Sequence, residues 1–449
     1  MINAQLDTAT GVRLIDQQPH VFHCNHYNRS LQQTIENCRH IDNKAILLHS
    51  AAEVAYLGLS YHFKQHADLS LLDKVLYAEA LYSFCGFGKL PLYQALQQAS
   101  GSSQFNFSTA FSHYGRALTL NFEKRKGAGE YFDLGFTIGA LSAIFEKPFS
   151  GQLTTEAISL QHAHTTFQID YNRHKTFAYL FNLTIPDTLT GSAPGLTASA
   201  DENKFATNID EVTIQRAVSQ APLYGNQQGL IPAFGVELTQ HYADYYNLIS
   251  FRFEQQLTQA LKERPILRDL LVYDYPALFY YKQYVQLEGL SLSRTLLIEA
   301  GHICGFNTLG GIMRSETWDA LVLPMIKTRE DWLFGILAII NTLGWGIWRI
   351  HDLIPGEKLV LRVWQPYESL GYLKWFGYSD HPIDYLVTGV TAALMNLLYE
   401  GDITAAPPLT LEYYYQINRS SISFWATQSR CVAMGDAYSE VTATRRQRG

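Results

Sequence analysis

Apolar residues recur at the helical spacing of three and four positions in three parts of the chain. Residues 29–38 and 251–262 show this spacing early in each half, and residues 383–399 show it again later. Because this spacing places apolar side chains on one face of a helix, each segment is expected to pack against a core. The pattern therefore predicts that each half begins with helices.

Strand patterns follow the helices in the second half. Aromatic and β-branched runs flank Pro355-Gly356 within residues 345–364, which predicts a β-hairpin. Residues 409–417 and 421–426 are predicted to form a second pair of strands. The order helix, hairpin, helix, hairpin predicts an α+β fold.

Three sequence landmarks recur in the same order in both halves. Two of them share an offset of 219 residues, and the third has an offset of 254. The matched pairs are Tyr27-Asn28 with Tyr246-Asn247, Cys85-Gly86-Phe87 with Cys304-Gly305-Phe306, and residues 130–146 with residues 384–400. Constant offsets on either side of one insertion predict two copies of one helix-plus-antiparallel-sheet domain, arranged as an internal pseudo-dimer. The expected boundaries are a first domain at 1–184, a linker and loop rich in turn formers at 185–234, and a second domain at 235–449.

Composition narrows the class of protein. Of the 449 residues, 47% are apolar and 17% are charged, which is enough apolar surface for two folded domains. The net charge is −7 and no extended basic run is present, which argues against a nucleic-acid partner. Residues 332–348 are uncharged but short for a membrane span, and they are expected to form a buried helix that runs into a strand. Five cysteines without a dense pairing pattern, and an N-terminus without a secretion signal, favour the cytoplasm.

The end of the second half carries the segment Cys431-Val-Ala-Met-Gly435-Asp436-Ala-Tyr-Ser439, preceded by a strand run and by the glycine-bearing helical segment 389–399. This arrangement resembles the closing signature of the 4-vinyl-reductase-type (hydrocarbon-binding) domain. That domain is shared with bacterial aromatic-responsive activators and is related to TRAPP vesicle-transport subunits and to an NO-signalling ligand-binding fold. The resemblance covers residues 240–442 and, through the repeat, residues 20–184. It implies that two tandem domains bind a small molecule.

The resemblance also bears on metal binding. Members of that family often carry a second cysteine eight positions after the first, and in some of them the pair helps to bind zinc. Ser439 takes the second position in this chain, so the resemblance does not carry a zinc site onto Cys431.

Reactive side chains are densest in residues 19–27. If the segment is extended, Cys24 and His26 lie on one face; if it is helical, His23 and His26 share a face. Because transition metals favour neutral imidazole and thiolate ligands, His23 and His26 are candidate metal ligands and Cys24 is a candidate catalytic thiol. The alternative is a set of hydrogen-bonded residues at the entry to the domain. The second half reads His241-Tyr-Ala-Asp-Tyr-Tyr at this place, so the two copies are expected to do different jobs.

A second candidate site surrounds Cys304. A cysteine acts as a nucleophile only as the thiolate, which needs a nearby positive group such as an imidazolium. His302 is close in sequence, and the pair His351-Asp352 is a second source of imidazole, so Cys304 and His302 are candidate catalytic residues. The alternative is that Cys304 is a small buried residue packed where a helix meets its neighbour.

The sequence contains none of the usual signatures of phosphate loops, dinucleotide sites, serine hydrolases or zinc proteases, whereas 28 Tyr and 24 Phe offer material for an apolar pocket. The leading hypothesis is binding of a small apolar or aromatic molecule, with candidate ligand-binding residues Tyr27, Tyr246, Phe306 and Asn307. The alternative is a specialised-pathway enzyme that uses a Cys/His centre or a transition metal in one of the two copies. The expected partner is a small-molecule ligand, joined by a second chain if the copies pair between chains, and neither nucleic acid nor a membrane span is expected.

Overall fold

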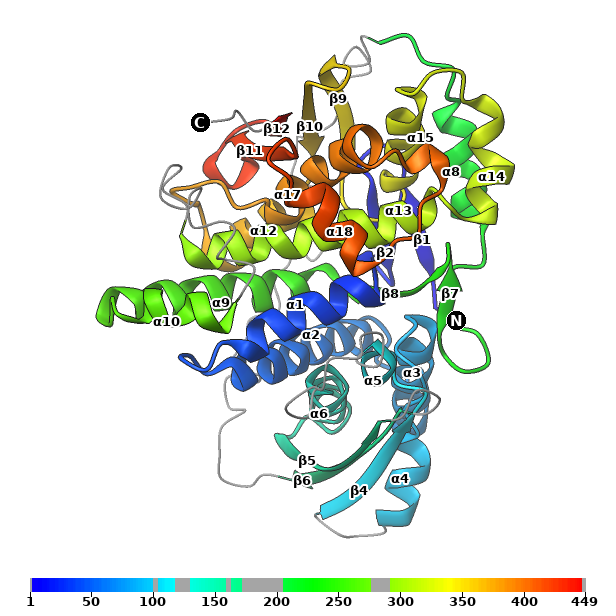
Figure 1. Ribbon diagram of the computed structural model, residues 1–449. Coiled ribbons are helices and arrows are strands. Elements are labelled where there is room, and N and C mark those ends of the chain that lie inside the picture. Colours follow the sequence, from blue (N-terminus) through cyan, green and yellow to red (C-terminus); the bar gives the residue numbers. More distant parts are fainter. Residues whose placement is uncertain are drawn as a thin grey trace.

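The computed structural model describes residues 2–99, 104–117, 130–158, 163–171, 205–275 and 291–445. Figure 1 shows a central group of helices from both halves, with the sheet of β4 to β6 at one end of the molecule and the sheet of β9 to β12 at the other. Helices and antiparallel sheets are both present, which confirms the predicted α+β fold.

The described elements of the first half are β1 (Ala4–Asp7), β2 (Val12–Ile15), β3 (Gln18–Cys24), α1 (Asn25–Asn37), α2 (Asn43–Gln65), α3 (Leu71–Phe84), α4 (Leu92–Ala99), β4 (Gln104–Ala110), α5 (His113–Ala117), α6 (Tyr131–Phe145), β5 (Phe149–Ile158) and β6 (Ala163–Tyr171). Those of the second half are α8 (Glu211–Gln220), β7 (Ile231–Ala233), β8 (Val236–Tyr242), α9 (Ala243–Glu263), α10 (Leu267–Asp274), α12 (Leu292–Cys304), the π-helix η2 (Gly305–Leu309), α13 (Gly310–Ile312), α14 (Glu316–Leu321), η3 (Leu323–Met325), α15 (Asp331–Ile340), β9 (Ile347–Ile354), β10 (Lys358–Trp364), α16 (Tyr367–Phe376), α17 (Tyr385–Met395), the π-helix η4 (Asn396–Glu400), η5 (Ile403–Ala405), α18 (Leu411–Asn418), β11 (Phe424–Arg430), η6 (Val432–Met434) and β12 (Ser439–Arg445).

One sheet joins the two halves. Its strand order is β1-β2-β3-β8-β7, and all neighbouring pairs are antiparallel. In the central pair, His23 lies opposite Thr239 and Phe22 lies opposite Gln240. β7 and α8 fall within residues 185–234, so the described part of the predicted linker contributes one strand to this sheet and one helix.

The helices that follow this sheet pack across the halves. α1 contacts α12, and α2 contacts α9 in the same way. All four helices lie side by side in Figure 1. Since each contact pairs the helix that directly follows the shared sheet in one half with a later helix of the other, the halves share one interior.

Two glycines set how closely α6 approaches α2 and how closely α17 approaches α12. A Cβ on Gly135 of α6 would lie 2.5 Å from the backbone oxygen of Leu48 in α2, and a Cβ on Gly389 of α17 would lie 2.3 Å from that of Ile298 in α12. Only glycine permits backbones to come this close. The sequence match of Gly135 with Gly389 thus falls on two helices that make matching contacts.

A turn with two glycines lies against the central strands in each half. Gly86 (φ +88°) would bring a Cβ to 2.7 Å from the Leu238 oxygen in β8, and Gly344 (φ +88°) would bring one to 2.4 Å from the His20 oxygen in β3. The left-handed backbone at both positions favours glycine.

The residue before each turn accepts a backbone hydrogen bond from the facing strand. Gln240 N donates to the Cys85 oxygen, and Phe22 N donates to the Leu343 oxygen, both at 2.8 Å. Cys85 therefore has the surroundings of Leu343, whereas Cys304 ends a helix that packs on α17. The sequence match between Cys85-Gly86-Phe87 and Cys304-Gly305-Phe306 does not correspond to matching positions in the fold.

Most of the elements predicted from the second half are observed. The hairpin around Pro355-Gly356 is β9 and β10, and residues 332–348 run from α15 into β9. The strand predicted at residues 409–417 is wrong, because these residues form α18. The Thr410 side chain accepts a hydrogen bond from Tyr413 N and starts that helix. Within the described residues, no helix has both the length and the apolar character needed to cross a membrane.

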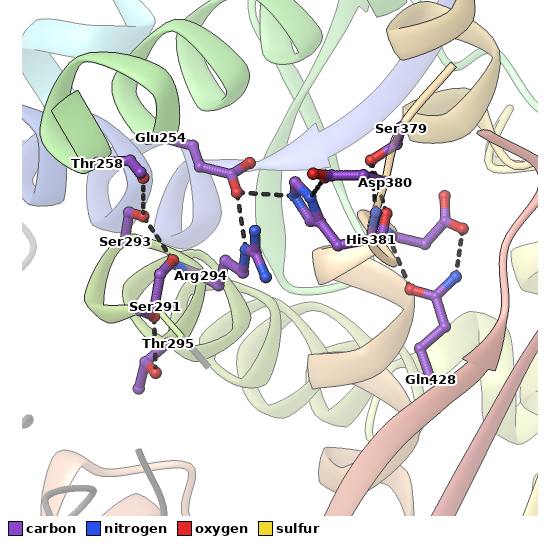
Figure 2. A network of polar contacts seen from close by, with 11 residues as sticks. Glu254, Thr258, Ser291, Ser293, Arg294, Thr295, Ser379, Asp380, His381 and Gln428 are labelled. Atoms are coloured by element: carbon purple, nitrogen blue, oxygen red, sulfur yellow. Dashed lines mark hydrogen bonds and ion pairs between the residues drawn. The ribbon is translucent and has the colours of Figure 1, made fainter. Parts of the chain in front are cut away.

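A polar network ties the helices beneath the second-half sheet together. Figure 2 shows His381, from the loop between α16 and α17, pointing at Glu254 of α9, which also faces Arg294 of α12. The Glu254 Oε1 oxygen lies 3.0 Å from His381 Nε2 and 2.9 Å from Arg294 Nε. These ion pairs position α12, which carries several of the candidate site residues.

Candidate functional site

Most of the residues predicted to carry function fall into two clusters around α12. His302 and Cys304 are two positions apart in this helix and so project about 200° apart. The His23 cluster, on the side of the shared sheet, consists of His23, Cys24, Tyr27, Tyr246, Cys304, Thr308, Trp345 and Tyr367. The His302 cluster, on the side of α18 and β11, consists of Glu299, His302, Phe306, Tyr414 and Trp425.

The ring of His23 is enclosed by aromatic side chains. It stacks on Tyr27 with centroids 4.2 Å apart and on Trp345 with centroids 5.0 Å apart, and the edge contact with Tyr246 is 4.5 Å. His23 is fully buried. Its two nitrogens face Tyr367 Oη at 3.3 Å and Cys304 Sγ at 3.8 Å. The imidazole near Cys304 is therefore that of His23, neither His302 nor His351.

The electrostatics of the His23 cluster keep its groups neutral. Burial raises the pKa of Cys304 well above its usual value and lowers the pKa of His23 well below its own. Burial also raises the pKa of Cys24, whose sulfur accepts a hydrogen bond from Thr308 Oγ1 at 2.7 Å. A thiolate needs a stabilising positive charge, and a neutral imidazole supplies none. The arrangement favours packing over nucleophilic chemistry at Cys24 and Cys304.

Metal binding finds little support in the geometry. Among the described residues, no group of three or more His, Cys, Asp and Glu side chains is arranged to hold a metal ion. His26 is half-buried, and burial together with the nearby Arg29 lowers its pKa to about 4. The described contacts of His23 are aromatic rings, a tyrosine hydroxyl and a thiol.

The segment that carries the family resemblance also lacks a metal-binding arrangement. Asp384 accepts hydrogen bonds from Ser439 Oγ at 2.5 Å and from Cys431 Sγ at 3.5 Å. Burial and the charge of Asp384 raise the pKa of Cys431 to about 12, which keeps the thiol protonated. These residues do not fit a zinc site. They form a hydrogen-bonded network at the start of α17.

The second half has a counterpart of His23 that the sequence did not reveal. His241 Nε2 lies 2.9 Å from Tyr114 Oη, and its ring lies 4.5 Å from that of Phe87. Phe87 occupies the glycine turn of the first half, as Trp345 occupies that of the second. His23 and His241 are separated by 218 positions, whereas Tyr27 and Tyr246 are separated by 219. An alignment that matches the two tyrosines therefore places His241 one position away from His23.

Asn28 connects the two histidine environments. Its Oδ1 accepts a hydrogen bond from Tyr246 Oη at 2.5 Å, and its Nδ2 donates to Thr239 Oγ1 at 2.9 Å. Tyr246 in turn contacts the rings of both His23 and His241. Tyr246 thus contacts residues of both halves at the interface between them.

In the His302 cluster, one ring nitrogen of the histidine lies against a carboxylate, and the other has no hydrogen-bond partner among the described residues. His302 Nδ1 lies 3.2 Å from Glu299 Oε2, and Tyr414 Oη donates to Glu299 Oε1 at 2.8 Å. Arg419 Nη2 lies 3.7 Å from the same carboxylate. His302 Nε2 is buried and makes no hydrogen bond with the residues that the structure describes. In the neutral tautomer whose Nδ1–H donates to Glu299, Nε2 is a hydrogen-bond acceptor.

One aromatic ring contacts this imidazole, and two more pack together elsewhere in the cluster. Trp425 makes an edge contact with His302 at 5.5 Å, and Phe306 makes one with Tyr414 at 5.2 Å. The side chains of His302 and Glu299 keep 4% and 10% of their surface exposed, so the cluster lies just beneath the molecular surface. Asn307 stays outside the cluster, because its amide donates to the Ile303 oxygen of its own helix. Phe306 and Asn307 belong to the π-helix η2, a rare element that is enriched near functional sites.

The first half has no histidine at the position that corresponds to His302. A Cβ on Gly389 would meet the backbone nitrogen of His302, and a Cβ on Gly135 would meet that of Ala52. Ala52 of α2 therefore stands where α12 carries His302. An alanine offers no hydrogen-bonding group, so this imidazole site exists once in the described structure.

Among known proteins, the chain shows similarity to solved structures only. No family model matches the chain, and no curated protein sequence matches it. A solved structure, the phenol-responsive sensory domain of the transcription activator PoxR with phenol, aligns over 36% of this chain and 70% of that chain at 14% identity, with a TM-score of 0.24. A TM-score this low supports no inference about fold or ligand.

Proposed function

We propose that this protein binds a small aromatic or apolar molecule bearing a hydroxyl group at the His302 cluster. The observation that carries the proposal is the buried Nε2 of His302, which has no partner among the described residues. A buried polar atom without a hydrogen bond costs about 1 to 3 kcal/mol, and a ligand hydroxyl that donates to Nε2 removes this cost.

The surroundings of Nε2 select the rest of the ligand. Trp425 lies against the His302 ring, and Tyr414, which contacts Glu299, packs on Phe306. Aromatic rings interact well with another flat ring. Glu299 fixes the tautomer of His302 from the other side and so sets the direction of the hydrogen bond. A phenol-like molecule matches both requirements.

Two related domains in tandem would provide the scaffold of this site. We infer an internal pseudo-dimer of two related domains, supported by the paired helix contacts, the paired glycine turns and the paired histidines His23 and His241. Since Ala52 replaces His302 in the first domain, one ligand should bind per chain.

Titration calorimetry with phenol and with anisole tests the proposal. Both have the same ring, but anisole lacks the hydroxyl proton, so phenol should bind roughly 10- to 100-fold more tightly. His302→Ala should abolish this preference, and His66→Ala, at an exposed position of the first half, should keep it. Circular dichroism first establishes that both variants are folded. Equal affinity of the wild-type chain for phenol and anisole would refute the proposal.

A further inference from the structure

A cleft between α8, α15 and β9 lies apart from both clusters. Its volume is about 80 Å³. Apolar walls come from Phe334 and Leu337 of α15 and from Trp348 of β9, and the polar lining includes Glu211 and Arg349. An enclosed cavity of about 150 Å³ takes up benzene, so this cleft suits a molecule smaller than a benzene ring.

The hydrogen bonds around the cleft leave a donor and an acceptor next to each other. Oε1 of Glu211 accepts from Asn341 Nδ2 and from Arg349 Nη1, each at 2.9 Å. Arg349 Nη1 also donates to the Trp348 oxygen at 3.1 Å. Within the described residues, Glu211 Oε2 and the Nε and Nη2 of Arg349 have no protein partner. The same ion pair therefore presents a free acceptor beside free donors.

Charge determines which small molecules fit. The charges of Glu211 and Arg349 cancel, so the pair attracts neither an anion nor a cation. Asp331 adds a negative charge nearby, because Thr207, which lines the cleft, donates to Asp331 Oδ1 at 2.8 Å. Burial acts to raise the pKa of Asp331, but hydrogen bonds from the Lys327 and Thr328 backbones outweigh it and lower that pKa. A carboxylate ligand is thus disfavoured, and a neutral group with its own donor and acceptor is favoured.

We propose that this cleft binds a small neutral primary carboxamide. Its carbonyl oxygen accepts from the free guanidinium donors of Arg349, and its NH₂ group donates to Glu211 Oε2. The short alkyl chain lies against Phe334, Leu337 and Trp348. This site is independent of the His302 cluster, since it uses other elements and a different ligand chemistry.

Ligand-observed NMR titration with propionamide, propionate and propylamine tests the assignment. Propionamide should bind the wild-type chain about tenfold more tightly than either charged analogue, because each of these places a charge beside the like charge of one half-buried partner. Glu211→Gln removes the carboxylate and leaves Arg349 unbalanced, so its preference should reverse towards propionate. Glu316→Gln is the matched control, since Glu316 likewise lies in the first turn of an exposed helix, and it should bind as wild type.

Three outcomes would overturn the assignment. The first is that propionamide fails to bind the folded wild-type chain. The second is that the wild-type chain binds propionate as tightly as propionamide. The third is that Glu211→Gln keeps the wild-type preference while circular dichroism shows it folded.

Discussion

At the scale of single residues, Cys304 shows how burial decides between chemistry and packing. Its thiol is fully buried, contacts Thr308 Oγ1 at 3.5 Å and has a raised pKa. Cys304→Ala should therefore lower the free energy of unfolding by about 1 to 2 kcal/mol through the small void it leaves. Cys304→Ser should cost at least as much, because it buries a hydroxyl that needs partners.

Chemical denaturation measures both variants of Cys304, and iodoacetamide measures the reactivity of the native thiol. Alkylation should be slow near neutral pH, since the protonated thiol reacts poorly. Rapid alkylation of Cys304 in the folded protein, slowed by a ligand, would instead establish it as a functional thiolate.

Sequence reasoning singled out five residues of the His23 cluster without finding their contacts. His23, Cys24, Tyr27, Tyr246 and Cys304 were all singled out by residue type or by repetition. However, His23 and Cys304 are 281 positions apart, and their contact depends on α12 packing against the first half. No local pattern encodes such a long-range pairing. The unpaired nitrogen of His302 was equally hidden, because it depends on which groups the fold places around the ring.

At the scale of elements, Gly389 allows α17 to pack closely against α12, the helix that carries His302. Gly389→Ala should destabilise the fold by roughly 2 to 3 kcal/mol, because the new methyl group would overlap the backbone of α12. Gly311→Ala is the control, since a Cβ there would lie 3.3 Å from its nearest neighbour, and it should change stability by less than about 1 kcal/mol. Thermal unfolding of both variants measures the difference. Equal stability would show that α12 and α17 are less tightly packed than their backbones indicate.

The network around His381 makes the packing of α9 and α12 depend on pH (Figure 2). Burial opposes a charge on His381, but hydrogen bonds with Glu254 and Asp380 outweigh it and raise its pKa above 6.5. Burial also acts to raise the pKa of Glu254, and hydrogen bonds with His381 and Arg294 outweigh it and lower that pKa below 4.5. His381 therefore stabilises the fold fully below about pH 6.5 and loses this effect as pH rises through its folded pKa. Glu254 stabilises it above about pH 4.5 and loses this effect as pH falls.

Unfolding by urea between pH 5 and pH 9 tests this dependence. The wild-type chain should lose stability above pH 6.5, and His381→Gln should flatten that part of the profile. His66→Gln, at an exposed position, should leave the profile unchanged. The same pH dependence in His381→Gln and in wild type would assign the effect to another group.

One segment of the second half was predicted to be a strand but forms a helix. Residues 409–417 are rich in tyrosine, which favours strands, yet they form α18. Thr410 at the N-cap and Glu412 in the first turn are helix-start signals, and Tyr414 and Ile417 bury one helical face. Capping and three-residue spacing outweighed intrinsic strand preference there. The hairpin at Pro355-Gly356 was predictable because its turn and its strands agree.

At the scale of the whole molecule, the central sheet makes the two halves one cooperative structure. β3 and β8 pair across the halves, and Asn28 joins Tyr246 and Thr239 within the buried interface. Either half alone would expose a strand edge and the apolar faces of α1 or α9. The turn-rich residues 185–204 of the predicted linker lie outside the residues that the structure describes. The shared sheet was not predicted: each half was expected to begin with helices, but β1 to β3 precede α1, and β7 and β8 precede α9.

Cutting the chain between the halves tests this cooperativity. A site-specific protease sequence can be inserted between residues 185 and 204, which the sequence predicts to be a linker. We expect the two fragments to stay together in size-exclusion chromatography, even at high salt, because the interface is mostly apolar and is little screened. The cleaved protein should still unfold in one transition, at a midpoint that depends on its concentration because the fragments can now dissociate. The uncleaved protein is the control, and its midpoint should not change with concentration. Two separate transitions, or fragments that elute apart, would mean that each half folds independently and that the shared sheet contributes little to holding them together.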